Sequence, residues 1–117
     1  MLAVTSSGTA KTYTVTPDES GAILNALHRL IGGRQLDRLR LGDFEMWLDE
    51  DGLLSGARVN RLASLVAARL GGPRQLYVGI AVFTGPLDEK GNATSLSAEA
   101  LARLKSVLAE AAKERRP

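Results

Sequence analysis

The chain has 117 residues, no cysteine, and 15 basic against 13 acidic side chains. A chain of this length can bury one hydrophobic core, and the lack of cysteine excludes disulfide bonds, thiolate nucleophiles and cysteine-ligated metals. The net charge of +2 is small, whereas a nucleic-acid-binding protein usually carries a clustered basic patch, so the charge balance alone does not indicate nucleic acid as the partner.

The first 16 residues are expected to contain two short strands. Residues 2–5 and 11–15 have a strand-like composition and flank Ser6-Ser7-Gly8-Thr9, which is typical of a hairpin or of an extended edge pair. The segment has no basic leader, and no window of the chain is apolar for long enough to cross a bilayer. We therefore expect a cytoplasmic protein that makes no membrane contact.

A helix and a second hairpin are predicted next. Thr16-Pro17-Asp18-Glu19 has the capping pattern of a helix start, and Gly32-Gly33 is typical of a helix end, so the predicted helix covers residues 17–31. Residues 34–48 alternate apolar with polar side chains on both sides of Gly42-Asp43. This pattern predicts two antiparallel strands joined by a tight turn.

An acidic turn and a second helix follow the hairpin. Asp49-Glu50-Asp51-Gly52 lacks the alternating oxygen ligands of a calcium loop, so we predict a simple turn with Gly52 in the left-handed conformation. Asn60 is a favourable N-cap for a helix over residues 60–70. Gly71-Gly72-Pro73 is typical of the end of that helix.

The last two elements complete the predicted fold. Residues 76–83 are apolar without alternation, which favours a central strand buried on both faces. Ser97 can cap a C-terminal helix over residues 97–115. The order β-β-α-β-β-α-β-α within one domain predicts the α+β class, as a small sandwich in which helices pack on a mixed or antiparallel sheet.

Four landmarks of the sequence resemble a known family. They are a helix ending in Leu30-Ile31-Gly32-Gly33, the acidic turn that ends in Gly52, the pair Asn60-Arg61, and the aliphatic segment around Val78-Gly79. From about Ala22 to Leu104 the chain is similar to domain-of-unknown-function family 3846, which is common in actinobacteria and their phages. The resemblance implies the predicted fold and a bacterial or phage origin. It implies no activity, because none is established for the family.

The chemistry of the side chains argues against most enzymes. His28 is the single histidine, and the sequence has no nucleophile elbow, phosphate-binding loop or metal-ligand pair. We therefore predict no metal and no cofactor. An enzyme with carboxylate-based chemistry is the third and least favoured of three functional hypotheses.

Two places on the predicted fold could bind a ligand or a partner. The first is the start of the second helix, where Arg58, Asn60 and Arg61 would surround backbone amides suited to an anion. A simpler interpretation is that Asn60 only caps the helix and that both arginines are solvated.

The second place is one face of the predicted hairpin. Antiparallel pairing would gather arginine, glutamate and tryptophan side chains on this face, and a tyrosine would join them if its strand is adjacent. An open face of this kind can stack bases or anchor a partner. The alternative is cross-strand ion pairing with the tryptophan as part of the core. The residues concerned are Arg38, Arg40, Glu45, Trp47 and Tyr77.

These candidates support three functional hypotheses in order of preference. The preferred one is a non-catalytic binding module that captures a protein partner or a small anionic ligand, as an accessory protein or a phage-encoded modulator would. The alternative is a nucleic-acid-associated protein that uses the basic and aromatic sheet face, with binding that weakens steeply as salt increases. The sequence leaves open the identity of the partner and whether the chain forms a homodimer.

Overall fold

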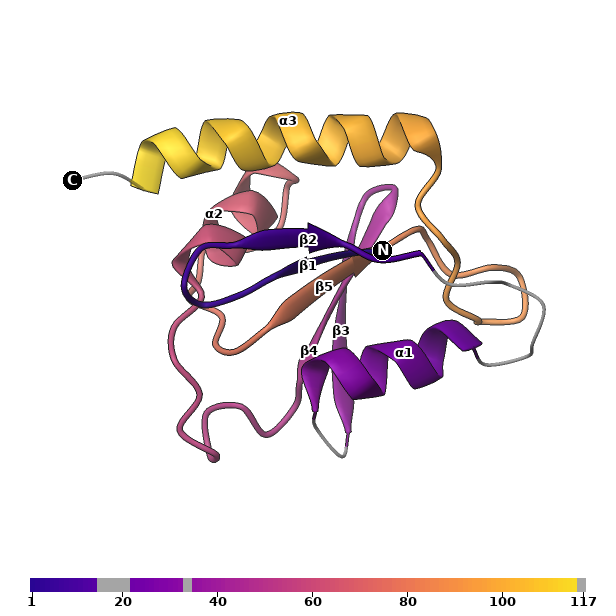
Figure 1. Ribbon diagram of the computed structural model, residues 1–117, viewed down its shortest axis with the longest axis horizontal. Coiled ribbons are helices and arrows are strands. Elements are labelled where there is room, and N and C mark those ends of the chain that lie inside the picture. Colours follow the sequence, from indigo (N-terminus) through magenta and orange to yellow (C-terminus); the bar gives the residue numbers. More distant parts are fainter. Residues whose placement is uncertain (15–21, 33–34, 116–117) are drawn as a thin grey trace.

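A sheet of five antiparallel strands forms the centre of the described chain (Figure 1). The structure is a computed structural model that describes residues 1–14, 22–32 and 35–115. Across the sheet the strands lie in the order β2-β1-β5-β4-β3. The strands are β1 (Leu2–Val4), β2 (Ala10–Thr12), β3 (Leu36–Leu41), β4 (Phe44–Asp49) and β5 (Ala81–Thr84), and the helices are α1 (Ala22–Ile31), α2 (Arg61–Arg69) and α3 (Ala98–Arg115).

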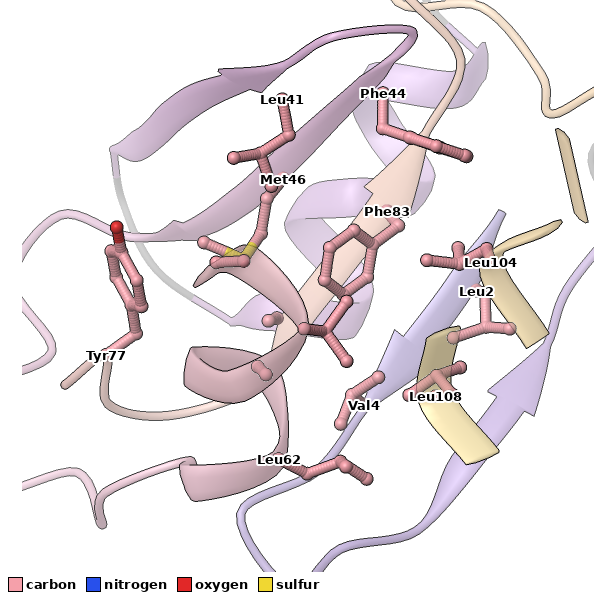
Figure 2. Packing of buried hydrophobic residues seen from close by; sticks show 14 of the residues in the cluster. Leu2, Val4, Leu41, Phe44, Met46, Leu62, Tyr77, Phe83, Leu104 and Leu108 are labelled. Atoms are coloured by element: carbon pink, nitrogen blue, oxygen red, sulfur yellow. The ribbon is translucent and has the colours of Figure 1, made fainter. Parts of the chain in front are cut away.

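The helices cover both faces of this sheet. α1 packs on one face, and α2 and α3 pack on the other, so the sheet is the middle of three layers (Figure 1). Successive side chains of a strand point to opposite faces, and this alternation divides the core in two. Figure 2 shows the larger part, where side chains of β1, β4 and β5 meet those of α2 and α3. The predicted α+β class and element order are confirmed.

The β3–β4 hairpin has the predicted tight turn. Gly42 adopts a positive φ of 64°, which glycine permits without strain, and Leu41 pairs directly with Phe44 across the turn. β4 also pairs with β5, which in turn pairs with β1. β5 is therefore the central strand of the sheet, as predicted for the aliphatic segment that contains it.

That central strand is shorter than the predicted range of 76–83. β5 begins only at Ala81, because Gly79 turns the chain with a φ of 79°. The residues before Gly79 run along a different neighbour, where Val78 forms an isolated antiparallel bridge with Val59. Leu76 is 63% exposed, so the apolar run is not buried along its whole length. The capping pattern at Thr16-Pro17-Asp18-Glu19 lies outside the described residues.

The acidic turn after β4 forms as predicted, but its glycine has another role. Gly52 donates its backbone N–H to the Asp49 carbonyl at 3.1 Å, and Asp51 donates its N–H to the Asp49 side chain at 3.0 Å. Gly52 does not have a positive φ, so the predicted left-handed conformation is wrong. It is required for space instead, because a Cβ there would lie 2.9 Å from Cγ2 of Val78.

Candidate functional site

The predicted gathering of side chains on the hairpin exists, but that face is not open. Arg38 pairs with Trp47 across the two strands. Arg40 lies directly opposite Glu45 in the strand register, so all four side chains share one face of the sheet, as predicted. The β4 part of that face lies under α1, and Trp47 is only 8% exposed, in the same core cluster as Leu27. The expected tryptophan platform is therefore wrong, because α1 covers a face that the strand pattern alone leaves free.

Polar contacts on this covered face are made within the protein. Trp47 Nε1 donates a hydrogen bond of 2.9 Å to Oγ1 of Thr84. Glu45 is 2% exposed, and its carboxylate accepts a bond of 3.4 Å from the Arg38 guanidinium. The interpretation as cross-strand ion pairing with tryptophan in the core therefore describes this face. Arg40 remains exposed on the edge strand β3.

Tyr77 lies on the opposite side of the sheet and does not join Trp47. It belongs to the core cluster that contains Met46 and Leu62, and Figure 2 shows it at the margin of that cluster. Its hydroxyl is buried, and this burial raises the pKa of the hydroxyl above its ordinary value. The sequence misplaces Tyr77 because the strand next to β4 starts after it.

Asn60 is a structural residue at the start of α2. Its Oδ1 accepts the backbone N–H of Ala63 at 3.0 Å, which caps the helix as predicted. Its Nδ2 donates to the carbonyls of Val4 and Gly79, both at 2.8 Å. Asn60 is completely buried, so a ligand cannot reach it. The Asn60 side chain is therefore not available to an anion, and its predicted role as the N-cap of α2 is confirmed.

The arginines beside Asn60 differ from it in their exposure. Arg58 and Arg61 are both exposed, and neither forms an ion pair with a residue in the described part of the chain. Arg61 is the first residue of α2 and lines a hollow on the surface of the protein. Of the eight predicted site residues, Arg61 alone contributes to this hollow.

This hollow, here called the α2 groove, lies between α2 and the segment that returns from it toward the sheet. Its volume is about 250 Å³. The middle of α2 provides an apolar floor, and the returning segment provides one wall. The residues that line the groove are Arg61, Ser64, Leu65, Ala68, Arg74, Gln75 and Leu76.

Ser64 holds the returning segment against α2. Its hydroxyl donates to the Asn60 carbonyl at 2.8 Å and accepts the backbone N–H of Tyr77, also at 2.8 Å. Asn60 donates its own backbone N–H to the Tyr77 carbonyl at 2.8 Å. The segment carrying Gln75 and Leu76 is thus tied to the first turn of α2 by two hydrogen bonds, both made by the backbone of Tyr77. These bonds hold Tyr77, and with it the neighbouring Gln75 and Leu76, beside α2.

Positive charge surrounds the apolar floor of the groove. Arg61 and Arg74 are exposed and have no ion-pair partner among the described residues. A second hollow of about 290 Å³ shares Leu65 and Arg74 with the groove and continues toward the C-terminal end of α3. There Arg69 donates two bonds to the Glu114 carboxylate, at 2.9 and 3.1 Å, so its charge is compensated.

An apolar surface continues from the groove toward the acidic turn. Val59 is 47% exposed and is bridged to Val78, two residues after the exposed Leu76. Leu53 and Leu54 in the turn are 81% and 89% exposed. We call these five side chains the apolar strip. Exposed apolar groups that gather in this way mark interaction surfaces more often than single scattered ones do.

Sequence reasoning missed most of the groove for an identifiable reason. Gly71-Gly72-Pro73 predicts only a helix end, and the range 76–83 predicts a buried strand, so neither pattern indicates Arg74 or Leu76 as surface residues of a groove. The useful signal was Gly79, a glycine inside an apolar run, which is typical of a bend or a close backbone approach. Because the chain changes direction at Gly79, the residues before it do not belong to β5, and Leu76 lies beside α2 instead.

The groove offers charge and apolar contact rather than groups for proton transfer. Its lining combines arginine and glutamine side chains with a serine hydroxyl that already donates and accepts. The part of the chain described by the structure contains no group of three or more histidine, aspartate or glutamate side chains placed to hold a metal ion. Within the same ranges, no helix is long and apolar enough to cross a membrane.

These features define a small α+β domain with a basic groove beside its second helix. The chain belongs to the family described as domain of unknown function (DUF3846), whose model matches residues 2–109. The family resemblance read from the sequence is thereby confirmed, and the match also takes in the N-terminal strands, beyond the predicted range of 22–104. No protein with a curated description and no solved structure matches the chain.

Proposed function

We propose that this protein is a non-catalytic binding module that captures an anionic partner in the α2 groove. The observation that supports the proposal is the pair Arg61 and Arg74, two exposed guanidinium groups beside a floor that contains Leu65. A guanidinium group binds carboxylate or phosphate oxygens through parallel hydrogen bonds, and such charge-assisted bonds are stronger than neutral ones. The ligand would therefore carry at least one anionic group next to an aliphatic one.

The composition of the groove favours an acidic protein segment over a nucleotide. Bases are usually held by stacking on aromatic side chains, and none of the described lining residues is aromatic. Leu65, Ala68 and Leu76 instead provide contacts for aliphatic side chains. A partner protein that presents glutamate or aspartate beside leucine fits this surface. Capture of such a segment is consistent with an accessory protein or modulator of bacterial or phage origin.

The two other hypotheses have less support. A nucleic-acid-associated protein was expected to use Trp47 on an open face, but Trp47 is buried under α1. Carboxylate-based chemistry is not favoured by the α2 groove, because none of its lining residues is acidic. The α2 groove is therefore the surface from which a function is best argued.

Binding of a defined acidic peptide tests this proposal. The probe is a fluorescently labelled peptide of alternating aspartate, glutamate and leucine, titrated with the full chain and followed by anisotropy. We expect saturable binding that Arg74→Glu or Arg61→Glu weakens by about tenfold or more, because loss of a charge-assisted hydrogen bond costs about 1.5–3 kcal/mol. Binding should also weaken as salt increases.

A matched control separates the groove from general positive charge. Arg40→Glu makes the same charge change on β3, at an exposed arginine that has no ion pair with any described residue. We expect this variant to bind the peptide with nearly the original affinity. Equal losses in Arg40→Glu and Arg74→Glu, with circular dichroism unchanged, would show that the groove is not the site.

A further inference from the structure

The acidic turn after β4 carries the two most exposed leucines among the residues that the structure describes. Leu53 and Leu54 are 81% and 89% exposed, although burying a leucine side chain is worth about 2 kcal/mol or more. The turn is not detached from the body of the protein. Gly52 lies against Val78, and residues 50–56 are held by several internal backbone hydrogen bonds. The leucines are thus presented to solvent on a supported turn.

Acidic groups precede these leucines directly. Asp49 uses one carboxylate oxygen to accept the backbone N–H of Asp51. The carboxylates of Glu50 and Asp51 form no ion pair within the described ranges, and both residues are exposed. The turn therefore combines free negative charge with exposed aliphatic side chains. This is the chemistry that the α2 groove is proposed to bind, so the inference that follows rests on the proposed function.

The turn and the groove lie on one continuous surface. From the turn, the apolar strip passes over Val59 and Val78 to Leu76, which lines the groove. Figure 1 shows the long loop after β4 and helix α2 at the same end of the molecule. Glu50 and Asp51 precede Leu53 at the turn, whereas Arg61 and Arg74 line the groove together with Leu76.

We infer that a second copy of this chain is a partner of the groove. Within one chain the leucines of the turn stay exposed, so the turn does not fill its own groove. A two-fold rotation about the middle of the strip would place the acidic turn of each copy on the basic groove of the other. In such a contact both copies use the same surface, and no further copy can be added, as in most homodimers. It would pair Glu50 and Asp51 with Arg61 and Arg74 of the second copy and would cover Leu53, Leu54, Val59 and Leu76.

This dimer and capture of another partner exclude one another, because both use the same groove. Self-association would protect the exposed strip from unspecific contacts until an acidic segment of higher affinity replaces the turn. The contact is small compared with permanent interfaces, so the dimer should be in reversible exchange with the monomer.

Sedimentation velocity of the full chain tests this inference. The experiment covers protein concentrations from about 10 μM to about 1 mM, where a weak specific contact becomes populated. The weight-average mass should rise from the 12.4 kDa of one chain toward twice that value, and addition of the acidic peptide should return it to one chain. Leu54→Ser and Arg74→Glu should each weaken the dimer by about tenfold or more.

Two further variants make the test specific. Leu24→Ser removes an exposed leucine from α1, on the other side of the sheet, and should leave the association unchanged. The combined variant Asp51→Arg with Arg74→Glu exchanges the charges of turn and groove. It should recover part of the association that Arg74→Glu alone loses, because unlike charges would again face one another.

The outcomes separate this inference from the proposed function. A chain that stays monomeric at every concentration while the acidic peptide still binds the groove overturns the dimer and leaves the proposed function standing. A dimer that is unaffected by both Leu54→Ser and Arg74→Glu uses another surface and also overturns the inference. If Arg61→Glu and Arg74→Glu both bind the peptide as well as the original chain does, and the chain also stays monomeric, then the inference and the proposed function are both overturned.

Discussion

At the scale of single residues, Asn60 holds the site together. One side chain caps α2 and also binds the carbonyls of Val4 in β1 and Gly79 before β5. Ser64, one turn further along α2, then binds the backbone of Tyr77. Because these contacts are buried, removing a partner leaves polar groups without hydrogen bonds, which costs more than the bond contributes. Residues that never touch a ligand thus define the groove.

The residue-scale prediction is a large loss of stability in Asn60→Ala. Loss of a helix cap costs about 1 kcal/mol, and two buried carbonyls would each lose a donor at about 1 kcal/mol more. We therefore expect the free energy of unfolding, measured by urea denaturation, to fall by about 3 kcal/mol. The control is Asn25→Ala on the exposed side of α1, where no loss is expected because alanine favours helix. A loss below about 1 kcal/mol in Asn60→Ala would contradict this role.

At the scale of elements, packing decides which faces are available to a partner. α1 covers the side of the hairpin that bears Trp47, so this side belongs to the core. α2 leaves Leu65 and Ala68 partly open beside the returning segment, so its flank forms the groove. The site is therefore the product of contacts between elements far apart in the sequence.

The element-scale prediction concerns the cover that α1 provides. Trp47 is the single tryptophan, so its fluorescence reports on this one place. We expect a blue-shifted emission and weak quenching by acrylamide in the folded protein. Leu27→Ala should shift the emission to the red and lower the free energy of unfolding by about 2–5 kcal/mol, because Leu27 is fully buried in the same cluster. Quenching as strong in the folded chain as in guanidinium would contradict burial under α1.

The elements themselves could be predicted from sequence, because their signals are local. The Gly42-Asp43 turn sets the register of β3 and β4, and Asn60 caps α2 through a residue three positions away. The cover over Trp47 and the position of Leu76 depend on contacts between distant segments, which no local pattern encodes. The predicted start of the central strand at residue 76 is wrong for this reason. The apolar composition of residues 76–78 is the same whether these residues pair within the sheet or lie outside it before Gly79.

At the scale of the whole molecule, the positions of the charged side chains matter more than the net charge. The net charge is only +2, yet exposed arginines without ion pairs line the α2 groove, and exposed carboxylates lie in the acidic turn. We propose that these two surfaces recognise an acidic aliphatic segment and a second copy of the chain. Composition could not reveal this arrangement, because the residues that form it come from the turn, from α2 and from the segment after α2.

A nitrogen-15 NMR titration of the full chain with the acidic leucine peptide tests most directly whether the α2 groove is the binding site. We expect chemical-shift changes concentrated at the amides of the groove residues Arg61, Leu65, Arg74, Gln75 and Leu76. The amides of β3 around Arg38 and Arg40 should move little, because β3 contributes no residue to the groove. Saturable changes centred on β3, or no localised changes at all, would contradict the assignment of the α2 groove as the binding site.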